Sequence, residues 1–183
     1  MPRTYRVIIR NGLVFDGAGS APAQLDIGID GDRIQDIENL KEARGLLEID
    51  AANRYVTPGF IDLTNHSDTH WTIFDHPRQE SLITQGITTI VGGNCGTSLF
   101  PLARAADIEG IQKWTDVSRI NVNWQRPGEF LTVLDGIGLG VNVATLVGHG
   151  TLRRAIGMDI TKPAVASDVR RLDYLLREAF YAG

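Results

Sequence analysis

Two stretches of the chain have the pattern of a buried strand that ends in polar side chains able to bind metal. The first is TPGFIDLTNHSD (57–68), in which the apolar run FIDL is followed by His66 and Asp68. The second is ITTIVGGNCG (87–96), in which a β-branched run is followed by glycines and Cys95. Such residues at the carboxyl ends of neighbouring parallel strands are typical of βα-barrel enzymes, so the two stretches predict one shared site.

The rest of the segment 57–183 alternates between helix and strand patterns, which favours a parallel α/β sheet. Pro77 and Pro127 open two helix patterns, Gly86 follows the first of them, and Ser167 can cap a third. Helices are therefore expected over 77–85, 127–134 and 167–182, and a third strand over 141–150.

The first 56 residues read as a β-rich segment without a candidate site. Asn11-Gly12 and Asp30-Gly31 are hairpin signals between short runs rich in Val and Ile. Strands are expected over 5–10, 13–16, 25–29, 33–37 and 45–50. The prediction is a small antiparallel sheet or β-sandwich-like segment over 1–56, followed by a barrel portion over 57–183.

Composition excludes several classes of protein. The formal net charge is −4 and no basic run occurs, which argues against nucleic acid as the partner. The single cysteine excludes an intrachain disulfide. The N-terminus lacks the apolar core of a signal peptide, and no apolar run approaches the roughly 20 residues that span a bilayer. We therefore expect a cytoplasmic protein with no membrane partner.

The motifs resemble the amidohydrolase superfamily and, more narrowly, the N-acyl-D-amino-acid deacylases (D-aminoacylases). Three landmarks of that family occur in order: GFID…HxD at 59–68, GNCG at 93–96 and GHGTLR at 148–153. The resemblance implies a β-sandwich segment and then a TIM-type (β/α)8 barrel, of which this chain would hold the first three βα units. It also implies a zinc cofactor, with Cys95 as a ligand in the place where relatives use a carboxylated lysine.

One position departs from the family pattern. The family places two imidazoles in an HxH pair on one strand face, and the matching residues here are Thr64 and His66. If the strand runs that far, Asp62 shares the same face. A Thr hydroxyl is a poor zinc ligand, so one ligand is missing. His66 is expected to face the metal, while His70 and His76 are expected on a loop.

Other readings of these residues stay open. His66 could be a hydrogen-bonded strand-end histidine, and Cys95 could be a small buried apolar residue or a nucleophile. Asp68 either hydrogen-bonds a ligand or the loop backbone, or lies solvated on the loop.

The remaining candidates are residues beside the expected metal. Asn94 and His149 are expected to orient a ligand or contact substrate, although His149 could equally make a structural hydrogen bond. Trp114 and Trp124 either line a substrate pocket or cover the barrel.

The expected activity is hydrolysis of the amide C–N bond of an N-acyl-D-amino acid or related linear amide, a small-molecule substrate. The barrel portion is about half of the roughly 250 residues of a complete barrel. By the resemblance, the other zinc ligands and the catalytic aspartate would lie downstream with the rest of the barrel, so no catalytic residue is assigned here and the fragment alone is expected to be inactive. The alternatives are a degenerate, non-catalytic scaffold, favoured by Thr64, and a dihydroorotase-like cyclic-amide hydrolase, disfavoured by GNCG.

Overall fold

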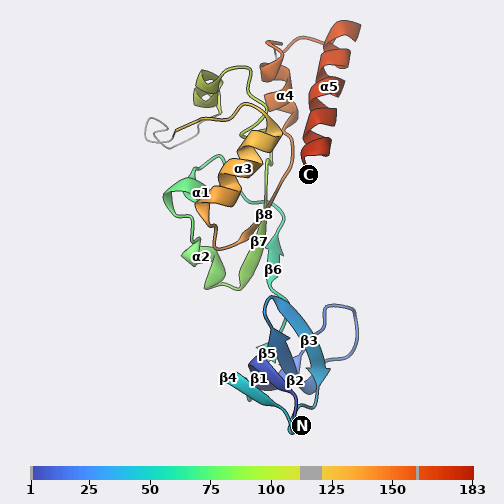
Figure 1. Cartoon of the computed structure of the whole chain (residues 1–183). Helices are drawn as coiled ribbons and strands as arrows, with labels where there is room; N and C mark the ends of the chain where they lie inside the picture. Colours follow the sequence, from blue (N-terminus) through green and yellow to red (C-terminus); the bar gives the residue numbers. More distant parts are fainter. Residues whose placement is uncertain (1, 112–120, 160) are drawn as a thin grey trace. The chain divides into compact units, whose positions relative to one another are not determined.

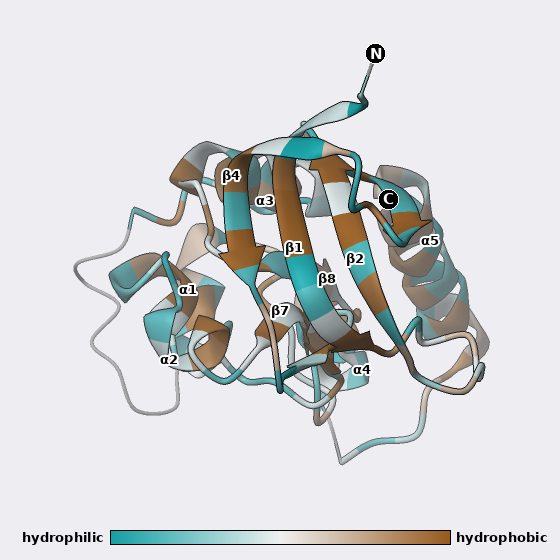
Figure 2. Ribbon diagram, turned by 90° about the horizontal axis from the view of Figure 1, so that it is seen from below, coloured by the Kyte–Doolittle hydropathy of each residue, from teal (hydrophilic) through white to brown (hydrophobic). Residues whose placement is uncertain are grey.

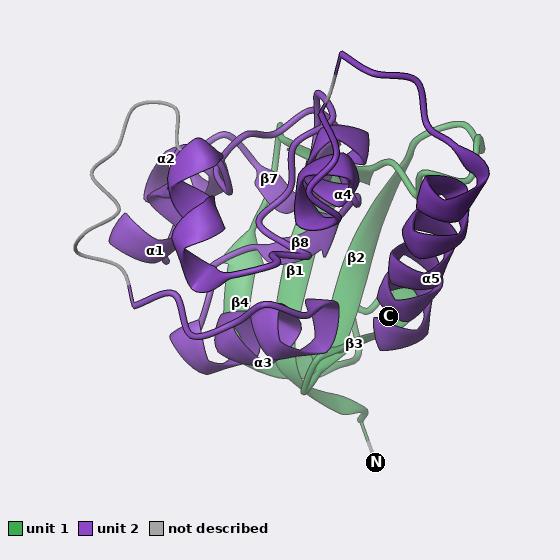
Figure 3. Cartoon of the chain, turned by 90° about the horizontal axis from the view of Figure 1, so that it is seen from above, with its two compact units in different colours: residues 1–58 green, residues 59–183 purple. Residues whose placement is uncertain are grey.

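The computed structural model describes residues 2–111, 121–159 and 161–183. The chain divides into two compact units, Met1–Pro58 and Gly59–Gly183, which Figure 3 colours separately. Unit 1 is all β, and unit 2 is mixed α/β (Figure 1). No helix in the described part of the chain is both long enough and apolar enough to cross a bilayer.

Unit 1 is a five-stranded mixed sheet in the order β3-β2-β1-β4, with β5 paired to β1. Its strands are β1 (Thr4–Val14), β2 (Ala23–Asp30), β3 (Arg33–Glu38), β4 (Arg44–Asp50) and β5 (Tyr55–Val56). The predicted antiparallel sheet is wrong in part, because β4 and β5 run parallel to β1. Apolar and polar residues alternate along β2 (Figure 2), as expected for a strand with one buried face, whereas β1 has three consecutive apolar residues, Val7–Ile9.

One of the two predicted hairpins forms. Asp30-Gly31 precedes β3, which pairs antiparallel with β2 as expected. Asn11-Gly12, in contrast, is not a turn: β1 continues through it, and the register with β2 shifts there as in a bulge. Asn11 has φ 61°, which a bulge uses as readily as a hairpin turn does.

The Arg10 side chain connects several elements of unit 1. Its guanidinium donates to both carboxylate oxygens of Glu48, at 3.0 and 2.8 Å. It also donates to the carbonyls of Leu40 (2.7 Å) and Ala43 (2.9 Å) and lies 3.4 Å from the carboxylate of Asp26. These bonds connect β1 to β2, to β4 and to the loop between β3 and β4.

Acid is expected to weaken this connection. The hydrogen bonds from Arg10 hold the pKa of Glu48 at about 2, below its ordinary 4.5. Because the pKa is lowered in the folded state, the contribution of Glu48 to stability is present above about pH 4.5 and is lost as the pH falls towards 2. Glu48→Gln should therefore lose less stability than wild type between about pH 6 and pH 3 in urea unfolding. Asp32→Asn, at a carboxylate whose side chain is 92% exposed, is the control. The prediction is contradicted if the free energy of unfolding falls by the same amount on acidification in wild type and in both variants.

Unit 2 contains a parallel sheet in the order β6-β7-β8, formed by Phe60–Asp62, Ile87–Gly92 and Asn142–Thr145. Its helices are α1 (Thr72–Asp75), α2 (Glu80–Ile83), the 3-10 helix η1 (Ala105–Gly110), α3 (Pro127–Ile137), α4 (His149–Ala155) and α5 (Ala166–Ala182). Helices separate the consecutive parallel strands, which confirms the predicted α/β class (Figure 1).

Two of the three predicted helices are present, and the first is much shorter than expected. The third helix is present as α5, although the Asp168 carboxylate, and not the predicted Ser167, accepts from the Val165 N–H and caps it. The second is present as α3, which begins at Pro127 and ends before Gly138. The first, expected over 77–85, shrinks to α2, because Gln79 adopts a left-handed conformation with φ 49°.

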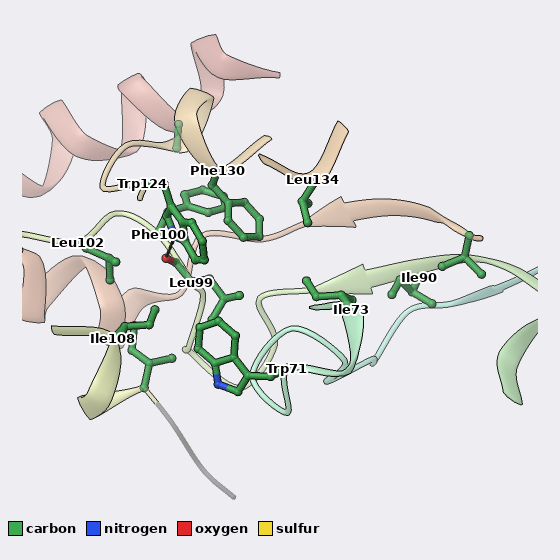
Figure 4. Close-up of a cluster of buried hydrophobic side chains, with 13 residues drawn as sticks. Trp71, Ile73, Ile90, Leu99, Phe100, Leu102, Ile108, Trp124, Phe130 and Leu134 are labelled. Carbon is green, nitrogen blue, oxygen red and sulfur yellow. Dashed lines mark hydrogen bonds between the residues drawn. The ribbon is translucent and has the colours of Figure 1, made fainter. Parts of the chain in front are cut away.

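The core of unit 2 combines aromatic and aliphatic side chains from the sheet, the helices and the loops between them (Figure 4). Trp71, Trp124 and Phe130 are almost fully buried, and Phe74 stacks on Trp124 with ring centroids 5.6 Å apart. The indole N–H of Trp124 donates to the Leu99 carbonyl at 2.9 Å. Trp124 is therefore a packing residue, whereas Trp114 lies outside the described residues.

Candidate functional site

The segment after β6 is a turn and not an extension of the strand. The strand ends at Asp62, so the expectation that Asp62, Thr64 and His66 share a strand face is wrong. The Asp62 carboxylate accepts from the Thr64 N–H (3.1 Å) and from the Asn65 side chain (2.8 Å), which turns the backbone. The Asn65 N–H donates to the Val91 carbonyl at 3.2 Å, which keeps the turn beside β7.

The segment after β7 is a tight turn that contains Cys95. Gly93 and Cys95 have positive φ, 73° and 55°. A Cβ on Gly93 would lie 2.0 Å from the Leu146 carbonyl oxygen, so only glycine fits there. The Gly150 N–H donates to the Gly96 carbonyl at 2.9 Å. The turn therefore rests on the backbone that follows β8.

Asp68 joins the two turns. Its side chain is buried, and one carboxylate oxygen accepts from the Gly93 N–H at 2.7 Å. Asn94 adds a second link, because its side-chain amide donates to the carbonyls of Val91 (2.6 Å) and Asn65 (3.3 Å). Both residues therefore hold the backbone on which His66 and Cys95 are carried, and the solvated-loop reading of Asp68 is wrong.

These links bring the two predicted ligands together. The Cys95 sulfur lies 3.7 Å from Nε2 of His66. Cys95 is exposed, so the reading of a small buried apolar residue is wrong. Nδ1 of His66 is buried and has no hydrogen-bond partner among the described residues.

The spacing of the two donor atoms fits a shared zinc ion. Zinc bonds of about 2.3 Å to sulfur and about 2.0–2.1 Å to nitrogen, at a tetrahedral angle, put the two ligand atoms about 3.6 Å apart. The observed 3.7 Å is close to that separation. Thiolate and imidazole are also donors that zinc prefers. Within the ranges that the structure describes, however, no three His, Cys, Asp or Glu side chains converge as a ready metal site.

The other candidates lie around this pair. Thr64 is exposed on the turn. His149 is the first residue of α4 and is exposed, and the backbone on either side of it packs against Gly96. A role for His149 in contacting substrate stays a prediction. His76 directly follows α1 and is exposed.

His70 has a neighbour that the sequence reading missed. It follows His66 by one turn, and the two ring centroids are 6.3 Å apart. The four-residue spacing, which corresponds to one helical turn, was the signal that could have revealed this.

Comparison with known proteins shows the family to which the chain belongs. Residues 47–178 match the model of the amidohydrolase family. The chain belongs to the amidohydrolase family. It is 31% identical over 179 residues to a D-aminoacylase and 35% identical over 182 residues to an N-acyl-D-aspartate deacylase, both from Alcaligenes xylosoxydans xylosoxydans. These alignments cover 98% and 100% of the chain but 36% of each relative.

A solved structure shows the same likeness. The N-acyl-D-glutamate deacylase of Bordetella bronchiseptica, complexed with zinc and a phosphonate inhibitor, matches with a TM-score of 0.82 and 28% identity, over 98% of this chain and 37% of that one. The amidohydrolase chain therefore spans just over a third of the length of these relatives. The resemblance to the N-terminal portion of N-acyl-D-amino-acid deacylases, predicted from the motifs, is confirmed.

The Asp68 link can be tested by substitution. Asp68→Ala leaves the buried Gly93 N–H without its acceptor and should lower the free energy of unfolding by about 1–3 kcal/mol. Asp68→Asn keeps an acceptor oxygen and should cost less. Asp75→Ala, at an exposed carboxylate on α1, should change stability by no more than about 0.5 kcal/mol. Equal unfolding free energies for the two alanine variants in urea denaturation would refute the role of Asp68.

Proposed function

We propose that this amidohydrolase chain is the N-terminal portion of a zinc-dependent enzyme that hydrolyses the amide C–N bond of an N-acyl-D-amino acid. The observation that carries the proposal is the 3.7 Å approach of the Cys95 sulfur to the His66 imidazole at the ends of two neighbouring parallel strands. The relatives supply the substrate class, since those named above are a D-aminoacylase and deacylases of N-acyl-D-aspartate and N-acyl-D-glutamate.

Two residues would hold the zinc ion and others would position them. Cys95, as the thiolate, and His66, through Nε2, would hold the zinc ion. Asp68 and Asn94 would fix the two turns, so that the donor atoms stay at the spacing the ion needs. Zinc in such a site supplies a nucleophilic water at neutral pH and polarises an amide carbonyl. His149 would contact substrate or orient a ligand.

The three parallel strands would be the first three of a (β/α)8 barrel. Parallel sheets are normally covered on both faces, yet Phe60, Ile61 and Leu63 on and beside β6 are 57%, 60% and 68% exposed. Further strands and helices of the complete enzyme would cover them. The remaining metal ligands and the catalytic carboxylate, which moves the proton to the leaving amine, would come from those parts. Unit 1 would contribute to a β-sandwich.

Metal binding by the chain itself is the direct test. Wild-type chain is expected to bind Co²⁺ with a thiolate-to-cobalt charge-transfer band in the near ultraviolet, and Zn²⁺ should displace the cobalt. Cys95→Ala should abolish the band, because the chain has only this cysteine. Ser81→Ala, an exposed substitution on α2, is the control and should leave the band unchanged. Absence of the band from the complete protein, which would carry the remaining ligands, would favour a non-catalytic scaffold instead.

Activity requires the complete protein. Complete protein purified with zinc should hydrolyse N-acetyl-D-amino acids, with release of acetate and the free amino acid. Cys95→Ala in that protein should remove both the metal and the turnover. Retention of stoichiometric zinc and full activity by that variant would disprove the proposal.

A further inference from the structure

The backbone between His66 and His70 is folded as a single helical turn. The His70 N–H donates to the His66 carbonyl at 2.9 Å, which is the i to i+4 bond of an α-turn. Side chains four residues apart on such a turn lie on the same face. The two rings accordingly lie next to each other, with centroids 6.3 Å apart and planes at 50°. Both side chains are half-buried, so both remain accessible to a small ion.

We propose that His70 is a third protein ligand of the metal ion held by Cys95 and His66. The inference rests on the proposed function, because it presupposes that the Cys95–His66 pair binds metal. Two ligands are too few, because protein zinc sites use three or four protein ligands, and Thr64 offers only an exposed hydroxyl. An imidazole presented one turn after His66 supplies the missing donor from the same loop.

The geometry requires a small side-chain adjustment. Two imidazoles bound to one tetrahedral zinc ion have ring centroids about 5 Å apart, given zinc–nitrogen bonds of about 2.0–2.1 Å. The observed 6.3 Å must therefore shorten by about 1 Å. Rotation of the two rings is the adjustment that the proposal requires, because the backbone of the turn already places both on one face. Nδ1 of His66 has no partner among the described residues to oppose its rotation.

The neighbouring carboxylate is not an equal candidate. Asp68 lies on the same turn, but its side chain is buried and one of its oxygens is bound to the Gly93 N–H. Its other oxygen, Oδ1, is buried without a hydrogen-bond partner among the described residues, but rotation of the carboxylate would also move the oxygen that accepts from Gly93. His70 can approach the ion while that link stays intact.

Nitrogen chemical shifts in the unaltered chain provide the first test. The chain has four histidines, His66, His70, His76 and His149, so each ¹⁵N-labelled imidazole can be assigned by single substitution. Titration of wild-type chain with Zn²⁺ is expected to move the signals of His66 and His70 and to leave those of His76 and His149 in place. Movement of the His66 signal alone would overturn the inference.

Cobalt affinity provides the second test. His70→Ala should keep the thiolate-to-cobalt band but weaken Co²⁺ binding by more than about tenfold, the smallest cost expected even for loss of a residue that supports a ligand. His76→Ala is the matched control and should bind as wild type does, and thermal melting should show that both variants fold. An unchanged affinity in His70→Ala, with the band still lost in Cys95→Ala, would refute the role of His70 alone. Absence of the band from this chain and also from the complete protein would refute the proposed function and this inference together.

Discussion

The hydrogen bond from the Gly93 amide to the Asp68 carboxylate is the contact on which the candidate site depends. β6 is only three residues long, so the sheet alone cannot position the turn that carries His66. The carboxylate accepts from the turn that carries Cys95, and β7, just before that turn, is bonded to the backbone after β8 because the Leu146 N–H donates to the Gly92 carbonyl at 3.0 Å. Because the bond is buried, water competes with it little, and it fixes the segment after β6 to the segment after β7.

Local sequence signals predicted those parts of the fold that local interactions determine. The Asp30-Gly31 hairpin, β7 and the start of α3 at Pro127 all follow from short stretches read by themselves. Asn11-Gly12 failed as a turn because a bulge needs the same backbone conformation, and pairing with strands distant in sequence decides between the two.

The helix expected over 77–85 failed for a related reason. Gln79 is buried, and its side-chain amide donates to the carbonyls of Thr72 (2.7 Å) and His76 (2.8 Å). Those contacts accompany a left-handed backbone at Gln79, which interrupts the helix that Pro77 would otherwise open. Tertiary contacts of this kind override helix propensity and cannot be recognised from the local sequence.

The site was predictable in its location but not in its geometry. That His66 and Cys95 would lie near each other followed from the rule that the carboxyl ends of parallel strands share one edge of the sheet. The alternation argument for Thr64 failed because β6 ends at Asp62, whose carboxylate turns the backbone. The turn at 66–70 was missed because it carries no apolar periodicity, the signal by which helical turns are usually recognised.

The geometry of the Arg10 side chain has a consequence for how unit 1 tolerates change. Its planar head serves two main-chain carbonyls and both oxygens of Glu48 at once. Lysine would preserve the positive charge, but a single ammonium group cannot span acceptors arranged around a flat fork. Arg10→Lys, usually regarded as a conservative replacement, would thus remove hydrogen bonds that hold the loop between β3 and β4, although the surface charge would not change.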